Sequence, residues 1–284
     1  MKKNLFLLCL FLISLGIQAQ KKEAYQIFNA KGKKVSYKKM LKTAAKNDVV
    51  FFGEFHNNAI AHWLQYELTN DLNQDNKLAL GAEMFERDNQ KQLDQYLLGS
   101  INEKALDSTA RLWPNFDTDY KPLLDYAKDH KLAFIATNVP RSYASLVYKG
   151  GFEALDTLSS KEKNWIAPLP IAFDPELETY KNILKMMGGH GSEKLVMAQA
   201  IKDATMAYSI SENLKEDEIF IHYNGSYHSD FHEGILWYLM QMKPQAKLMT
   251  ISTVSQENIY KLDKEFLNKA DFIIVVDKNM TNTY

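Results

Sequence analysis

The chain has 284 residues, of which 46% are hydrophobic and 24% are charged, and its formal net charge is −1. This profile is that of an ordinary globular protein and excludes a disordered or collagen-like chain. Lysines and acids are interspersed without a basic stripe, so the sequence gives no case for nucleic acid as a partner.

The first twenty residues differ in character from the rest. They begin with two lysines, continue with an apolar run over residues 5–17, and end in the small and polar residues IQAQ. The run is too short for a comfortable membrane span and is typical of a secretory signal peptide. We therefore expect residues 1–20 to be a signal peptide and residues 21–284 to be a single domain. The protein would be exported across the inner membrane, and be periplasmic or peripheral at the outer membrane.

The sequence contains a single cysteine, Cys9, which lies inside this apolar run. It is too early in the run to be the lipid-modified residue of a lipoprotein, so we see no lipobox. Without the segment the chain has no cysteine, which excludes disulfides, a cysteine nucleophile and thiolate metal sites.

Short apolar segments then alternate with helical patterns, after an irregular lead-in over residues 21–36. This alternation predicts an α/β fold with a mostly parallel central sheet and helices on both faces. We expect the helix-rich stretch 86–215 to form a helical cap over the C-terminal edge of the strands. The expected strands are 48–54, 77–85, 131–138, 218–225, 247–252 and 271–277, and the expected helices are 37–46, 57–72, 88–98, 119–130, 193–214 and 231–242, with further helical segments through 142–187.

Polar residues follow four of these strands directly. In parallel α/β sheets, ligands bind at the carboxyl ends of the strands, so these side chains are expected to converge on one site. They are Glu54 and His56 in GEFH, Glu83 in GAEMF, Asn138 and Arg141 in NVPR, and His228 in NGSYH.

Two of the strand ends share the spacing G-x-x-H, in GEFH and GSYH. The glycine lets the backbone leave the strand sharply, and the histidine then points over the sheet edge. The two imidazoles, together with Glu54 and Glu83, could hold one divalent transition metal ion with an open position. Equally, Glu54 and Glu83 could serve as acid and base in hydrolysis without a metal. Each histidine could also be a structural imidazole at the start of a helix.

Glu83 follows an apolar run that is expected to be buried on both faces. A buried acid is costly unless it is paired, and Arg141 or Arg87 is the expected partner, either within the site or as a structural salt bridge beneath it.

In the predicted helix 193–214, Gln199 and Asp203 lie four residues apart and share one face, which either turns towards the site or forms the polar edge of a core helix. His62, in the helix after the first strand, is interpreted as a surface residue. His190, in the loop GGHGS, could lie on a mobile lid.

Together, GEFHNN, GAEMFERDNQKQLDQYLLG, DYKPLLDYAKDHKLAFIATNVPR, AQAIKDATMA and NGSYH resemble the ChaN-type haem-binding uptake proteins of the Tiki and TraB superfamily. The resemblance covers about residues 45–235 of the chain. It implies an exported protein of bacterial haem or iron acquisition with haem as its cofactor. A second copy of the chain and outer-membrane haem transport components are the further partners that it implies.

In that family a dimer holds two haems face to face, and each iron takes a tyrosine from one subunit while a histidine of the other contacts the haem. The resemblance leaves the tyrosine open among Tyr143, Tyr120, Tyr180 and Tyr227. The residues expected to contact the cofactor are His56, Asn138, Arg141, Tyr143, Gln199, Asp203 and His228.

The superfamily also implies a rival function, because Tiki proteins are similar to metal-dependent proteases built on two G-x-x-H motifs and a glutamate. His56, Glu83 and His228 would then hold the metal, and Glu54 would be the general base. A third alternative is a binding module for a small exported ligand.

Overall fold

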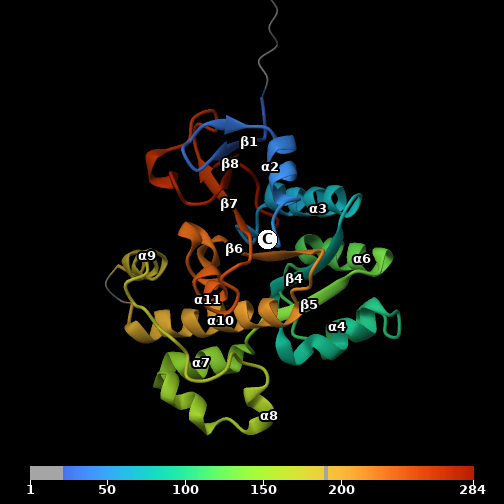
Figure 1. Ribbon diagram of the computed structural model, residues 1–284, viewed down its shortest axis with the longest axis vertical. Helices are drawn as coiled ribbons and strands as arrows, with labels where there is room; N and C mark the ends of the chain where they lie inside the picture. The colour runs from blue at the N-terminus through green and yellow to red at the C-terminus, as the bar shows by residue number, and fades with distance from the viewer. Residues whose placement is uncertain (1–21, 189–190) are drawn as a thin grey trace, which may run out of the picture.

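The computed structural model describes residues 22–188 and 191–284 (Figure 1). The expected signal peptide and His190 lie outside the described residues. In the described part of the chain, every helix is too short or too polar to pass through a bilayer.

An eight-stranded sheet with the order β2-β1-β8-β7-β3-β6-β4-β5 forms the centre of the molecule. Strands β3 to β8 pair with one another in parallel, whereas β1 is antiparallel to both β2 and β8. The predicted α/β class and the mostly parallel sheet are confirmed. The strands are β1 (Tyr25–Asn29), β2 (Lys34–Val35), β3 (Val49–Glu54), β4 (Lys77–Glu86), β5 (Ala133–Asn138), β6 (Glu218–Gly225), β7 (Leu248–Gln256) and β8 (Phe272–Asp277).

Helices cover both faces of this sheet. The α-helices are α2 (Tyr37–Ala44), α3 (Ala59–Asn73), α4 (Gln90–Leu97), α5 (Glu103–Thr109), α6 (Lys121–His130), α7 (Arg141–Gly150), α8 (Ser160–Lys163), α9 (Glu178–Met186), α10 (Glu193–Asn213) and α11 (Ile235–Met242). Short helical turns are η1 (Arg87–Asn89), η3 (Phe152–Thr157), η4 (Ser226–His228), η5 (Asp230–His232) and η6 (Lys264–Phe266), and η2 (Phe116–Tyr120) is one turn of π-helix.

Strand β3 shows why the centre of the sheet is buried on both faces. Its side chains alternate, so Val50 and Phe52 pack into the core beneath α3 while Val49 and Phe51 pack beneath α10 and α11. Figure 1 shows α2 and α3 beside the upper strands, with α10 crossing the lower part of the molecule and α7 and α8 beyond it.

The lead-in was predicted to be irregular, and this prediction was wrong. Residues 25–35 form the β1–β2 hairpin, which extends the sheet by pairing with β8. The sequence of this stretch is polar and lysine-rich, and β1 has only three buried residues. Three buried positions are too few for a recognisable strand pattern.

Candidate functional site

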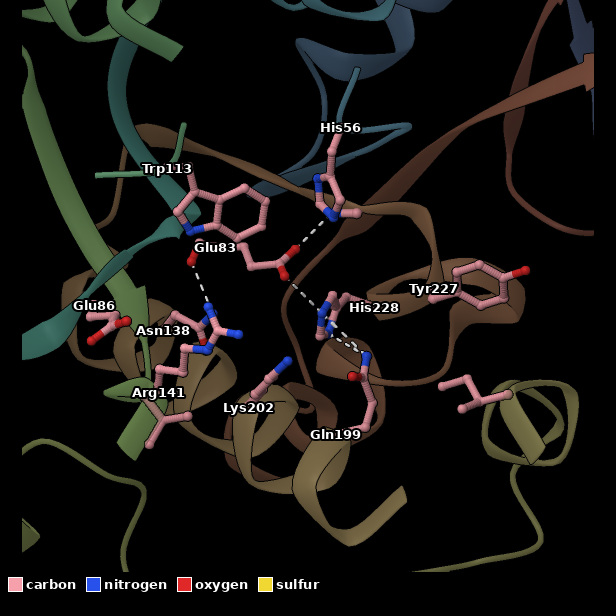
Figure 2. A pocket seen from close by; sticks show the side chains of 13 residues that line it. His56, Glu83, Glu86, Trp113, Asn138, Arg141, Gln199, Lys202, Tyr227 and His228 are labelled. Atoms are coloured by element: carbon pink, nitrogen blue, oxygen red, sulfur yellow. Dashed lines mark hydrogen bonds and ion pairs between the residues drawn. The ribbon is translucent and has the colours of Figure 1, made fainter. Parts of the chain in front are cut away.

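The carboxyl ends of β3, β4 and β6 meet at one edge of the sheet. Strand β6 lies between β3 and β4, and its Gly225 is in register with Glu54 of β3. Strand β4 has a register irregularity between Ala82 and Glu86, and such bulges re-aim side chains near functional sites. The predicted convergence is present: Figure 2 shows His56, Glu83 and His228 pointing towards one another.

Glu54 and His56 form the first half of the site. Glu54 is 1% exposed, and its Oε1 lies 2.9 Å from Nδ1 of His56. The same carboxylate accepts hydrogen bonds from the Tyr120 hydroxyl at 2.9 Å and from Nε2 of Gln65 at 2.5 Å. Burial alone would raise the pKa of Glu54, but the bond to His56 and the charges nearby lower it. Burial would likewise lower the pKa of His56, and Glu54 and Glu83 raise it instead.

Two side chains fix the backbone carbonyl of His56. Its carbonyl accepts a hydrogen bond from Nδ2 of Asn115 at 2.7 Å and lies 3.1 Å from Nε2 of His62. Asn115 directly precedes the π-turn η2, and single π-turns recur at functional sites. The interpretation of His62 as a surface residue was therefore wrong, since it is only 8% exposed within this network.

His228 forms the second half of the site and lies between two buried carboxylates. Its Nδ1 is 2.5 Å from Oδ1 of Asp203, and its Nε2 is 3.1 Å from Oε1 of Glu83. Oδ2 of Asp203 accepts a further bond from Tyr180 at 2.9 Å. Burial would lower the pKa of His228, but Glu83 and Asp203 overcome this and raise it to about 9. At neutral pH the ring is therefore a buried imidazolium.

Glu83 connects the two halves. Its Oε2 accepts the backbone N–H of Gly225 at 2.7 Å while Oε1 faces His228. Burial would raise the pKa of Glu83, but the His228 charge lowers it well below its usual range. The partner predicted for Glu83 was an arginine, and this was wrong: Arg87 instead lies 3.3 Å from Glu212.

A cavity of about 430 Å³ opens above these groups. Of the residues expected from the sequence, it brings together His56, Glu83, Asn138, Arg141, Gln199 and His228. Glu54 and Asp203 lie behind the two histidines, and Tyr143 lies in the apolar cluster between α7 and α10. Gln199 Nε2 lies 3.0 Å from Nδ1 of His228, so the polar face of the helix does turn towards the site.

Sequence reasoning missed several lining residues, among them Glu86, Trp113, Val139, Ile183 and Lys202. Lys202 had a usable signal, because it lies one helical turn from Gln199 on α10. Trp113 had none, since it belongs to an irregular loop that only the fold brings next to His56, with ring centroids 4.8 Å apart. Arg141 of α7, Ile183 of α9 and Gln199 of α10 reach the cavity from outside the sheet, while a cap over the whole edge stays a prediction.

This geometry gives little support to the metal alternative. Among residues 22–188 and 191–284 there is no group of three or more His, Cys, Asp or Glu side chains arranged to hold a metal ion. Both ring nitrogens of His228 already face carboxylates, so this ring offers no free lone pair while it is protonated. The geometry does not favour a hydrolase in which His56, Glu83 and His228 hold a metal.

Comparison with known proteins identifies the family to which the chain belongs. A ChaN protein of Campylobacter jejuni, whose structure is described as showing cofacial haem binding, has a TM-score of 0.68 and 20% sequence identity over 90% of this chain and 98% of its own. A Bacillus cereus protein has a TM-score of 0.51 and 12% identity over 89% of this chain and 95% of its own. No curated protein matches the sequence. The model of the family described as haem-binding uptake, Tiki superfamily, ChaN matches residues 40–239, which is well over half of the chain. The chain therefore belongs to the ChaN family of haem-binding uptake proteins.

Proposed function

We propose that this protein binds haem in the cavity at the carboxyl edge of the sheet and acts in bacterial haem uptake after export. The observation that carries the proposal is the composition of the cavity, whose size falls within the range of about 300–1,000 Å³ usual for ligand pockets. Haem is a flat apolar ring with two carboxylates and a ferric iron, and the cavity offers a matching group for each part. The apolar groups are Trp113, Val139 and Ile183, the cations are Arg141 and Lys202, and the phenol is Tyr227.

Tyr227 is the best candidate for the iron ligand. Of the four tyrosines that the family resemblance left open, it is the one that lines the cavity. Its hydroxyl donates to the thioether of Met186 at 2.9 Å, and a thioether is a weak acceptor that is easily replaced. When bound, haem supplies a ferric centre for which tyrosinate is an established axial ligand.

The other three tyrosines are poorly suited to this role. Tyr120 and Tyr180 are buried and donate to Glu54 and Asp203, so burial and the neighbouring carboxylates raise the pKa of each phenol. Burial also raises the pKa of Tyr143 to about 12. A phenolate at any of these three positions would therefore be costly.

Hemin titration of the mature protein tests this proposal. We expect a shifted Soret band with high-spin tyrosinate features, and saturation at about one haem per chain. Tyr227→Phe should remove the tyrosinate features and weaken binding by at least about tenfold, or ~1.4 kcal/mol. Tyr143→Phe, in the same protein but outside the cavity, should behave like wild type. An unshifted Soret band at micromolar protein would refute haem binding, and equal spectra for both variants would refute Tyr227 as the ligand.

Export is supported by the character of residues 1–20, with two lysines followed by an apolar run and small residues. We propose that the signal is removed and that the mature protein meets outer-membrane haem transport components in the periplasm. N-terminal sequencing of the protein recovered from a periplasmic fraction should begin near residue 20. Recovery of the intact N-terminus in the cytoplasmic fraction would contradict export.

A homodimer is the assembly we propose for the loaded protein. The support is that the Campylobacter jejuni ChaN structure is described as cofacial haem binding, an arrangement in which two haems stack on each other. Sedimentation velocity should show a monomer without hemin and twice that mass with it. A loaded protein that sediments as a monomer at micromolar concentration would rule the dimer out.

A further inference from the structure

The charges that line the cavity do not balance. Its two carboxylates are already neutralised within the protein, Glu83 by His228 and Glu86 by a salt bridge to Arg111 at 2.7 Å. The two cationic side chains of the cavity, Lys202 and Arg141, are not neutralised by a salt bridge. Over residues 22–188 and 191–284, neither the Lys202 ammonium nor the Arg141 guanidinium has an ion-pair or hydrogen-bond partner.

These two cations lie on one wall. Lys202 belongs to α10 and Arg141 is the first residue of α7, and the two helices pack together through residues such as Tyr143 and Ile201. Figure 2 shows both side chains on the side of Glu83 opposite His56, with their nitrogens directed into the cavity. Two neighbouring cations without a salt-bridge partner form a site for an anion with more than one oxygen.

The surfaces next to this wall are apolar. Val139 follows β5 directly, Ile183 projects from α9, and the Trp113 ring stands at the mouth beside His56. A ligand that satisfies both surfaces must join a broad apolar body to carboxylates at one end. A small inorganic anion would leave the apolar surface exposed to water. A neutral apolar ligand would leave the two cations without a partner.

We propose that Lys202 and Arg141 form a carboxylate clamp that selects porphyrins by their propionate groups. This inference rests on the proposed haem-binding function and goes beyond it, because it assigns ligand specificity to the α7–α10 wall. The clamp distinguishes a porphyrin free acid from its ester, whereas an iron ligand alone would treat the two alike. Arg141 can hold a carboxylate through two parallel N–H bonds, and Lys202 adds a point charge.

The experiment compares ferric protoporphyrin IX with its dimethyl ester in the same co-solvent, using the mature protein. Wild type should bind the free acid at least about tenfold more tightly than the diester, or ~1.4 kcal/mol. Lys202→Met should reduce this ratio several-fold by weakening the free acid much more than the diester, and Lys202→Arg should restore it. Lys194→Met is the matched control, since Lys194 lies on the same helix but donates to the carbonyl of Lys149 at an exposed position.

Metal-free protoporphyrin IX provides a second readout, because it cannot use an iron ligand at all. Its binding, followed by porphyrin fluorescence, should still weaken in Lys202→Met and remain unchanged in Lys194→Met. A wild-type protein that binds acid and diester equally, or a Lys202→Met variant that keeps the wild-type ratio, would overturn the clamp and leave haem binding intact. A wild type that binds neither ferric porphyrin would overturn the haem proposal and the clamp together.

Discussion

Gly225 lies directly against the imidazole of His56. A Cβ atom at this glycine would come within 2.8 Å of Cε1 and 2.9 Å of Nε2 of the ring. The contact follows from the pairing of β3 with β6, which sets Gly225 beside Glu54, two residues before His56. Since Gly225 has φ −56 and ψ 139, a conformation open to any residue, the ring and not the backbone requires glycine here.

We therefore expect Gly225→Ala to displace His56 and cost about 1–3 kcal/mol in unfolding free energy, as over-packing does in a tight site. The shift of the His56 ring signals in NMR spectra measures the displacement. Gly99→Ala is the control, because Gly99 has φ +70 with open space around it, so alanine there adds strain far from the site. A Gly225→Ala protein with unmoved His56 signals would contradict the contact.

The charge on His228 makes stability depend on alkaline pH. The pKa of its ring is about 9 in the fold and about 6.5 in an unfolded chain. The bound proton therefore stabilises the fold fully below about pH 6.5, and this contribution is lost as the pH rises through about 9. The loss is on the order of 3 kcal/mol. Urea unfolding at a series of pH values should show it, and Asp203→Asn, which removes one carboxylate, should move it to lower pH.

A second buried histidine, His222, should give the opposite pH dependence of stability to that of His228. Burial lowers its pKa to about 4, so its neutral ring stabilises the fold above about pH 6.5 and this contribution is lost as the pH falls through about 4. His222→Asn should flatten the acid side of the stability curve and leave the alkaline side as it is. An alkaline loss that Asp203→Asn does not move would show that His228 is not its origin.

The last residues of the chain support the site from a distance. The hydroxyl of Thr283 donates to Oδ2 of Asp119 at 2.7 Å, and the same carboxylate accepts from Asn115, which holds the His56 carbonyl. Thr283→Val should cost about 0.5–1.5 kcal/mol, the usual net contribution of one hydrogen bond to stability. Denaturant unfolding measures it, and the exposed Thr281→Val should be neutral. Equal stabilities of the two variants would contradict a supporting role.

Trp113 should contribute to hemin affinity through its ring. It stands at the cavity mouth and meets both His56 and Tyr120 edge to face, with centroids 4.8 and 5.8 Å away. Trp113→Ala removes this apolar wall, and we expect hemin binding to weaken by about tenfold, or ~1.4 kcal/mol. Soret titration gives the affinity, and Trp63→Ala on α3, where the ring is 46% exposed, is the control. An unchanged affinity in Trp113→Ala would place the ligand elsewhere.

The sheet and its polar edge could be predicted from sequence because the central strands have a strong local signal. Runs such as VVFF are buried on both faces, and the glycines at positions 53 and 225 mark where β3 and β6 end. Parallel strands place their carboxyl ends together, so the meeting of His56 with His228 followed from topology rather than from any contact.

The remaining parts of the site depend on long-range contacts that leave no local pattern. Glu83 is neutralised by His228 and not by arginine, because β6 inserts beside β4 and brings the imidazole closer. His62 is buried against Asp119 and Tyr120 of the π-turn before α6. Neither a loop tryptophan nor a threonine near the chain end carries a sequence signal, yet both contact the groups around His56.

The position of β6 between β3 and β4 also constrains the order of events during synthesis. Both neighbours leave the ribosome well over a hundred residues before β6, so the middle of the sheet stays open until late in translation. The two histidines therefore belong to one pocket only after that gap closes. If this pocket holds hemin, as we propose, retention of hemin would report that the central strand has been inserted.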